Sequence, residues 1–426
     1  MFTAIRLRVN ISLAQCCMTY LTLHNRLKDC FSQDADCISI PDSSIQIRNY
    51  TFVSEHANVL PGSHLYRCSH HNIDFEETYP APRDTSDEID NDLNAADCHI
   101  ESNRTFRYSV FSPKEVESST QVIILFHGLN EKHWEKYLSW AYRLVELTGK
   151  TVILFPIAFH MNRVPPGWSH PRKMNLVSAE RQKKYPTVAE SSFANAAIST
   201  RIQKRPQRFF WSGRQTYSDI LQLIRGIKNG DHPHIHKDTT IDLFAYSIGS
   251  FLSEILLMTD TDGFFTNSRL FIFCGGPTLD RMYPVSRYIL DSEANIALYS
   301  FFIEHLDNEC KLNARLNHYF NEGHRSGIYF RSMLSSHRLK KIREDRFREI
   351  GTRLAALALI QDEVIPPGEV LNTLKGDFRD MPAKVEVLDF PFTYSHVTPF
   401  PQQKNIENEV DKAFQQVFSM AADHLR

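Results

Sequence analysis

The sequence predicts an α/β protein with a mostly parallel central sheet flanked by helices. Continuous apolar runs, which are typical of strands buried on both faces, recur at 121–128, 151–159 and 353–360. Segments with apolar residues at helical spacing lie between these runs, and the links that join run to helix are short. This alternation indicates βαβ units, in which the crossover helices place the strands parallel.

Residues 1–115 are expected to form an N-terminal extension with some β-strands. SIQIRNYTFVSE (44–55) and RTFRYSVFSP (104–113) alternate apolar and polar residues, which predicts antiparallel strands packed onto the main sheet. Residues 81–99 between them are acidic and rich in turn formers, which predicts a surface loop or a flexible segment.

Residues 116–426 are expected to form the main domain, and its first unit has the clearest pattern. QVIILFHG (121–128) predicts a buried strand, and HWEKYLSWAYRLVELTG (133–149) predicts a helix that stops at Gly149. TVILFPIAF (151–159) then predicts a second strand, which completes a strand–helix–strand unit.

Two segments, about 160–207 and about 277–350, interrupt this pattern and are expected to be helical insertions. Each is too long for a plain connection, and both lie beside the carboxyl ends of strands, where α/β active sites open. We therefore expect them to form a cap. Six aromatic residues in or beside them fit either a pocket wall or the core of the cap: Trp168, Phe209, Phe210, Trp211, Phe301 and Phe302.

The remaining elements follow in chain order. Residues 209–230 predict a helix, and TIDLFAYSIGSFLSEILLM (240–258) predicts a strand that leads directly into a helix. Further strands are predicted at 269–276, 353–360 and 384–392, and an amphipathic helix at 404–424.

Composition narrows the classes of function. The 426 residues are 42% hydrophobic, which allows a large core, and a formal net charge of −2 gives no attraction to nucleic acid. No apolar run reaches the roughly 18–20 residues of a membrane-spanning helix, so a soluble protein is expected. The eight cysteines form no CxxC pair, and the first 23 residues lack a clean signal cleavage site. Mostly free thiols and a cytoplasmic location are therefore expected, with secretion as the alternative.

Ser247 stands at the abrupt strand-to-helix turn within 240–258. Ala245 and Gly249 flank it two residues away on either side. Such a turn demands small residues when it exposes a serine hydroxyl as a nucleophile. An ordinary βα turn with Ser247 as helix N-cap is the alternative interpretation.

The order of motifs along the chain resembles the α/β-hydrolase superfamily over roughly residues 120–426. An early strand ends in HG, a later strand ends in AxSxG, an acid follows a late strand in ALALIQDEVIPP (356–367), and a histidine follows the last strand in FPFTYSHVTPF (390–400). The resemblance implies a triad of Ser247 as nucleophile, His396 as general base and Asp362 as orienting acid. Asp280, which follows the strand ending in GG, is the alternative acid.

The resemblance also implies an oxyanion hole. The N–H of Ile248 lies at the start of the helix after the nucleophile, and the N–H of Leu129 is the expected second donor, with Gly128 giving the close approach. HGLNEKHW (127–134) departs from the more glycine-rich or aromatic loop that the superfamily often has.

The resemblance implies a serine hydrolase that cleaves an ester or related acyl bond of a small molecule, with no metal and no organic cofactor. Two alternatives stay open: a catalytically silent α/β-hydrolase-fold binding protein, and a peptidase or acyltransferase on the same scaffold. DHPHIHKD (231–238) looks like a metal site but is predicted to be a solvated loop, and SHH (69–71) has no clear partner set. Neither GxxxxGK nor GxGxxG occurs, so no phosphate-binding loop is predicted.

Overall fold

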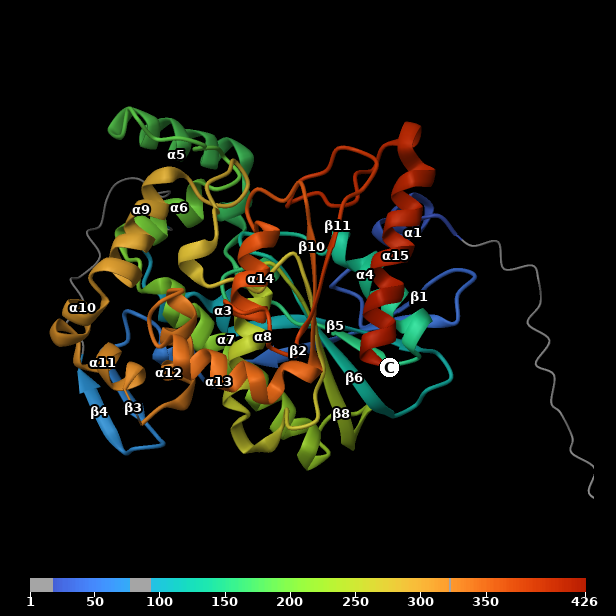
Figure 1. Ribbon diagram of the computed structural model, residues 1–426, viewed down its shortest axis with the longest axis horizontal. Helices are drawn as coiled ribbons and strands as arrows, with labels where there is room; N and C mark the ends of the chain where they lie inside the picture. The colour runs from blue at the N-terminus through green and yellow to red at the C-terminus, as the bar shows by residue number, and fades with distance from the viewer. Residues whose placement is uncertain (1–17, 77–92, 322) are drawn as a thin grey trace, which may run out of the picture.

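A computed structural model describes residues 18–76, 93–321 and 323–426 (Figure 1). Its centre is a sheet with the strand order β1-β2-β5-β7-β6-β8-β9-β10-β11. The strands are β1 (Cys37–Ser39), β2 (Ile45–Val53), β5 (Thr105–Pro113), β6 (Ser119–Phe126), β7 (Thr151–Leu154), β8 (Ile235–Tyr246), β9 (Leu270–Phe273), β10 (Leu354–Leu359) and β11 (Lys384–Leu388). The strands from β7 to β11 in this order pair in parallel, whereas β1, β2 and β5 pair antiparallel and extend one edge. The prediction of an α/β protein with a mostly parallel sheet is confirmed.

Helices cover both faces of this sheet and extend beyond it. They are α1 (Tyr20–Cys30), α3 (Glu101–Arg104), α4 (Glu135–Thr148), α5 (Pro171–Lys184), α6 (Ala196–Lys204), α7 (Arg208–Asn229), α8 (Ile248–Thr259), α9 (Ser292–Tyr299), α10 (Leu306–Leu312), α11 (Ala314–Phe320), α12 (Arg325–Leu334), α13 (Lys340–Ile350), α14 (Pro367–Lys375) and α15 (Glu407–Leu425). Figure 1 shows α1, α4 and α15 on one side of the sheet and α7 and α8 on the other. No helix of the described segments is long and apolar enough to span a bilayer.

The two faces of the sheet explain why its strands are apolar throughout. In β6, Ile123 and Leu125 pack with α1, α4 and α15, whereas Val122 and Ile124 pack with α7 and α8 on the opposite face. Successive side chains of a strand point to opposite faces, so a strand covered on both sides buries every residue. The same alternation continues through β8, β9 and β10.

Helices α5 and α6 lie within 160–207, and α9 to α13 lie within 277–350. The two segments pack against one another, and a buried ion pair joins them. Arg181 of α5 donates from Nε and a terminal nitrogen to the two carboxylate oxygens of Asp291, at 2.6 and 2.8 Å. Asp291 also caps α9, so the pair fixes the start of that helix.

A hairpin of β3 (Leu65–Cys68) and β4 (Ile73–Glu76) stands apart from the main sheet.

Several predicted strand boundaries are wrong, including that of the strand predicted over 269–276, which ends at Phe273. The strand predicted over 151–159 ends at Leu154, because the Ile157 N–H donates to the His127 ring instead of a neighbouring strand. The strand predicted over 384–392 ends at Leu388, ahead of Pro391, which has no N–H to continue a ladder. The strand predicted from residue 240 begins at Ile235, so part of the predicted loop 231–238 is strand.

The predicted surface loop 81–99 is wrong for its described part. Residues 81–92 lie outside the described residues. Most of the N-terminal segment considered as a signal peptide, residues 1–17, also lies outside them. Asp97, however, is almost fully buried and accepts hydrogen bonds from Arg201 and Arg208. A buried carboxylate is stable only when its charge is paired in this way. No disulfide joins the described cysteines.

Candidate active site

Ser247 occupies a strained turn between β8 and α8. Its backbone has φ 55° and ψ −125°, a conformation that non-glycine residues rarely adopt. Its side chain makes no capping hydrogen bond to α8. The alternative that Ser247 is an ordinary N-cap is therefore wrong, and the turn instead directs the hydroxyl toward His396.

Close packing beneath this turn explains why small residues flank Ser247. A Cβ on Gly249 would lie 2.8 Å from the carbonyl oxygens of Phe126 and His127, a distance that real Cβ atoms do not show. A Cβ on Gly128 would meet the Ser247 Cβ at 3.4 Å and the Tyr246 ring at 3.3 Å. The close approach expected of Gly128 thus brings the loop after β6 against the serine.

The structure brings Ser247, His396 and Asp362 into one hydrogen-bonded row. The His396 Nε2 lies 2.7 Å from the Ser247 Oγ, and the His396 Nδ1 lies 2.7 Å from the Asp362 Oδ2. All three side chains are at most 5% exposed. An ionised carboxylate only accepts, so Nδ1 carries the proton and Nε2 presents its lone pair to the hydroxyl. This is the tautomer that a general base requires.

The second carboxylate oxygen of Asp362 is held by the backbone. Its Oδ1 accepts hydrogen bonds from the N–H groups of Val364 at 3.0 Å and Ile365 at 2.8 Å. Asp280, the alternative acid, accepts instead from Thr278 and from the backbone and hydroxyl groups of Ser336. Asp362, and not Asp280, therefore contacts the imidazole.

Tyr246 fixes the position of His396. Its hydroxyl donates to the His396 carbonyl oxygen, and its ring stacks on the imidazole with centroids 5.3 Å apart and planes 15° apart. Burial raises the pKa of Tyr246 well above its usual value, so the hydroxyl keeps its proton and remains a donor. The Lys136 Nζ lies over the Tyr246 ring, 4.6 Å from its centroid.

A buried polar chain holds the loop after β6. The Gly128 N–H donates to the Tyr137 hydroxyl at 3.0 Å, and that hydroxyl donates to Glu131 at 2.9 Å. His127 accepts at Nε2 from the Ile157 N–H, so its Nδ1 carries the proton and donates to the Gly128 carbonyl at 2.8 Å. Burial lowers the pKa of His127 well below its usual value, which keeps this tautomer neutral.

The two expected oxyanion donors are left available by this arrangement. Neither the Leu129 N–H nor the Ile248 N–H donates to another residue of the described segments. Ile248 is the first residue of α8, where backbone N–H groups have no partner within the helix and carry partial positive charge. The Gly128 N–H, in contrast, is committed to Tyr137.

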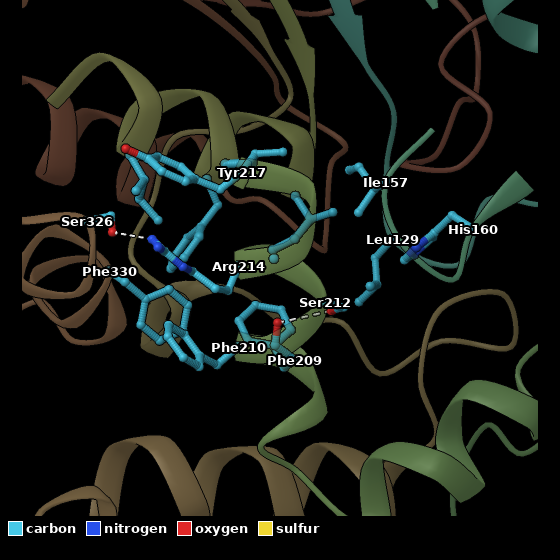
Figure 2. A pocket seen from close by; sticks show the side chains of 15 residues that line it. Leu129, Ile157, His160, Phe209, Phe210, Ser212, Arg214, Tyr217, Ser326 and Phe330 are labelled. Atoms are coloured by element: carbon cyan, nitrogen blue, oxygen red, sulfur yellow. Dashed lines mark hydrogen bonds between the residues drawn. The ribbon is translucent and has the colours of Figure 1, made fainter. Parts of the chain in front are cut away.

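Leu129 and Ile248 also line a mostly apolar pocket of about 660 Å³ (Figure 2). Figure 2 shows Phe209, Phe210 and Phe330 grouped together, with Leu129 opposite them. The pocket is lined by Leu129, Ile157, His160, Phe209, Phe210, Ser212, Gly213, Arg214, Tyr217, Ile248, Phe251, Leu252, Ile255, Ser326 and Phe330.

A second pocket, also of about 660 Å³, adjoins the first. The residues that line both are Leu129, His160, Phe209 and Ser212. Its walls are more polar and include the buried pair of Asp97 and Arg208. Leu129, which carries the second expected oxyanion donor, therefore lines both the apolar pocket and the more polar one.

His160 presents an unused nitrogen at the boundary between these pockets. Its Nδ1 lies 2.9 Å from the Ala158 carbonyl oxygen and donates to it, so Nε2 carries a lone pair. That Nε2 is buried and has no partner among the described residues. Burial lowers the pKa of His160 to about 4, so the ring is neutral near pH 7.

Sequence reasoning did not identify Tyr137, Glu131, Tyr246 or His160 as part of the site. No local motif marks them, because each acts through a tertiary contact. The six aromatic residues divide between the two roles left open. Phe209 and Phe210 line the apolar pocket, and Trp168 and Phe209 line the more polar one. Trp211 and Phe302 are core residues, and Phe301 packs against the core.

Comparisons with known proteins give one family match and distant structural similarity. A family model described as a family of unknown function (DUF6051) matches residues 18–426. No curated protein matches the sequence. The chain is similar to a thermostable esterase from Pseudomonas putida at 11% identity, with TM-score 0.41 over 95% of this chain and 89% of that one.

Two further esterases resemble the chain to a similar degree. A cold-adapted esterase from an Arctic intertidal metagenomic library matches at 10% identity and TM-score 0.37, over 90% of this chain and 95% of that one. Carboxyl esterase 2 from Tuber melanosporum matches at 10% identity and TM-score 0.38, over 74% and 82%. Identities and TM-scores this low carry no argument about activity, which depends on the site itself.

Proposed function

We propose that this chain, which belongs to the family of unknown function DUF6051, is a serine hydrolase of α/β-hydrolase fold that cleaves an ester or related acyl bond. The observation that carries the proposal is the buried row of Ser247, His396 and Asp362, with both hydrogen bonds at 2.7 Å. A serine hydroxyl is a weak nucleophile unless a correctly oriented base takes its proton. The strained backbone of Ser247 adds support, since such strain concentrates at functional sites.

In the proposed acylation step, the Ser247 Oγ attacks the carbonyl carbon while its proton moves to the His396 Nε2. Asp362 stabilises the imidazolium that forms, without itself becoming protonated. The carbonyl oxygen becomes an oxyanion that accepts hydrogen bonds from the N–H groups of Leu129 and Ile248. One donor of this kind typically accounts for about 10²–10³ in kcat.

His396 then returns the proton to the leaving alkoxide, which departs as an alcohol, and the acyl group remains on Ser247. Water attacks this acyl-enzyme and transfers its proton to His396, which restores the serine and releases the acid. The row of side chains therefore carries the proton in both halves of the reaction, and no redox partner or metal enters either half.

The apolar pocket supports assignment of the acyl side of the substrate. Its wall includes Leu129 and Ile248, the two residues whose N–H groups would hold the oxyanion, so an apolar group attached to the carbonyl would be directed toward it, although Ser247 and His396 are not among its lining residues. The helical segments 160–207 and 277–350 would then form the cap, since Phe330 within the second segment and Phe209 just after the first line the pocket. His160 would accept a hydrogen bond from the substrate at the boundary of the two pockets.

A catalytically silent scaffold is the contrasting proposal from a different class. Silence requires a misaligned or obstructed triad, and the 2.7 Å contacts on both sides of His396 argue against misalignment. A peptidase or acyltransferase would use the same row of residues. Substrate tests, and not the triad, separate these activities.

The test is labelling with a fluorophosphonate probe, which reacts with activated serines without any assumption about substrate. Wild type should label, whereas Ser247→Ala and His396→Ala should not. Ser253→Ala is the matched control, because Ser253 lies on α8 but its hydroxyl only donates to the Gly249 carbonyl. A folded wild type that resists the probe, or equal labelling of Ser247→Ala, would overturn the proposal.

The class of acyl bond is tested with p-nitrophenyl esters of increasing chain length, the matching anilides, and an added alcohol acceptor. Hydrolysis of the esters alone is the expected result. Preferential cleavage of anilides would make the protein a peptidase, and acyl transfer to the alcohol at the expense of hydrolysis would make it an acyltransferase.

A further inference from the structure

Four potential metal ligands meet where the β3–β4 hairpin lies against α11 and α12, away from the candidate active site. Cys68 is the last residue of β3, and His71 lies in the turn that leads to β4. His318 lies on α11, and His324 immediately precedes α12. Figure 1 shows the hairpin beside these two helices, although 256 positions separate Cys68 from His324 in the chain.

Three of the distances between the donor atoms are close to those of a tetrahedral zinc site. The Cys68 Sγ lies 3.6 Å from the His71 Nδ1 and 3.5 Å from the His324 Nε2, and the His324 Nε2 lies 3.0 Å from the His318 Nε2. Bonds of about 2.3 Å to sulfur and about 2.05 Å to nitrogen at tetrahedral angles require separations of about 3.6 Å for S···N and about 3.3 Å for N···N. All four donor atoms lie within 4.8 Å of one another.

Hydrogen bonding alone does not account for this convergence. A neutral imidazole nitrogen either donates one proton or accepts one. The His324 Nε2 nevertheless faces both the Cys68 Sγ and the His318 Nε2. A cation at the centre is the arrangement that uses all these lone pairs together.

The surroundings hold the four side chains in place. Cys68 is 2% exposed and His324 is 8% exposed. Gly323 allows the loop before α12 to approach His71, because a Cβ there would lie 3.0 Å from the His71 ring. The Tyr319 ring stacks on His324 with centroids 4.5 Å apart and planes 27° apart.

We propose that Cys68, His71, His318 and His324 bind one zinc ion in a closed structural site. Thiolate and imidazole ligands in a tetrahedral set favour zinc over the hard, oxygen-seeking cations. Four protein ligands leave no position for water or substrate, which distinguishes a structural from a catalytic zinc site. Binding releases the proton of the Cys68 thiol to solvent, because the thiolate is the ligand.

The zinc ion fastens the N-terminal hairpin to the helices that wall the apolar pocket. Ser326, two residues after His324, lines that pocket and accepts a hydrogen bond from Arg214 at 2.8 Å. Arg214 in turn lies over the Tyr319 ring, 5.0 Å from its centroid. Loss of the metal would therefore loosen this wall of the pocket without touching Ser247, and the site stands independently of the proposed hydrolase activity.

The interpretation that SHH (69–71) has no partner set is wrong. CxxH at 68–71 is a local signal for two ligands, but its partners His318 and His324 are separated from it by about 250 positions, and only the fold brings them near. The segment 231–238, which looks like a metal site in the sequence but is predicted to be a solvated loop, behaves differently. There His234 bonds to the Tyr50 hydroxyl through Nδ1 at 2.7 Å, and His232 packs on the same ring.

The experiment measures metal content and cobalt spectra of the full chain. Purified wild type should contain one zinc per chain by mass spectrometry of its metals. After removal of zinc with a chelator, Co²⁺ should bind and give the intense visible bands of tetrahedral cobalt with a thiolate-to-metal charge-transfer band in the near ultraviolet. Wild type that neither retains zinc nor takes up Co²⁺ with these bands would overturn the proposal.

Variants then assign the ligands. Cys68→His should retain cobalt binding but lose the charge-transfer band, and His324→Ala should weaken zinc binding more than about 100-fold, beyond the usual effect of outer-shell changes. His70→Ala is the matched control, since His70 adjoins His71 but is not among the four ligands, and it should bind zinc like wild type. A charge-transfer band that persists in Cys68→His, or equal loss of zinc in His70→Ala and His324→Ala, would refute the assignment. If His324→Ala does not fold, the wild-type and Cys68→His spectra still decide.

Discussion

Asp362→Asn is the substitution whose effect the structure specifies most closely. The two oxygens of Asp362 have different partners: Oδ1 accepts from the N–H groups of Val364 and Ile365, and Oδ2 accepts from the His396 Nδ1. In the asparagine variant the amide oxygen must take the Oδ1 position, because two backbone donors point there. The amide NH₂ then faces His396.

This orientation of the amide reverses the tautomer of the base. An NH₂ group donates, so the His396 Nδ1 must accept and the proton moves to Nε2. A protonated Nε2 in a neutral ring cannot take the proton of Ser247. In serine proteases the equivalent change costs roughly 10⁴-fold in kcat, which corresponds to about 5 kcal/mol of transition-state stabilisation. We expect a loss of this size here.

The assay is the rate of fluorophosphonate labelling, followed by kcat for the best ester found in the substrate screen. Asp280→Asn is the matched control, because Asp280 bonds to Thr278 and Ser336 and not to the imidazole. It should retain activity within about tenfold of wild type, since any loss would come from the loop that it supports. An Asp362→Asn variant as active as Asp280→Asn would refute the proposed role of Asp362.

Three further predictions follow from the packing around the site. Gly249→Ala places a Cβ 2.8 Å from two carbonyl oxygens, so the rate of fluorophosphonate labelling should fall at least about tenfold. Gly368→Ala is the control, because a Cβ there has nothing within 4 Å, and its labelling rate should be unchanged. Equal labelling rates for the two variants would contradict this packing. Tyr137→Phe removes the partner of the buried Gly128 N–H and should lower the free energy of unfolding by about 1–3 kcal/mol, measured by urea denaturation. Because the folded pKa of His160 is about 4, against about 6.5 when unfolded, its stability contribution is present above pH 6.5 and is lost as pH falls toward 4. Compared with His160→Gln, wild type should lose on the order of 2 kcal/mol more between pH 7 and pH 5, and parallel curves for the two proteins would argue against a buried neutral ring.

The sequence by itself determined the features that depend on neighbours in the chain. The parallel strands were predictable because a strand buried on both faces must be apolar at every position, as Val122 to Leu125 are. The turn at Ser247 was predictable because the small residues that it needs lie two positions away. Strand ends were less predictable, because at Ile157 the backbone bonds to a histidine ring from another loop.

The tertiary structure decided what depends on residues far apart in the chain. The sequence left two candidates for the acid, Asp362 and Asp280. Asp362 faces His396 because it follows β10, and His396 follows the neighbouring strand β11, whereas Asp280 bonds to Ser336. Cys68 and His324 come together only because the hairpin packs on α12, and no local pattern encodes such a contact. Short-range sterics and hydrophobic periodicity are written along the chain, whereas the partners of buried polar groups are set by the whole fold.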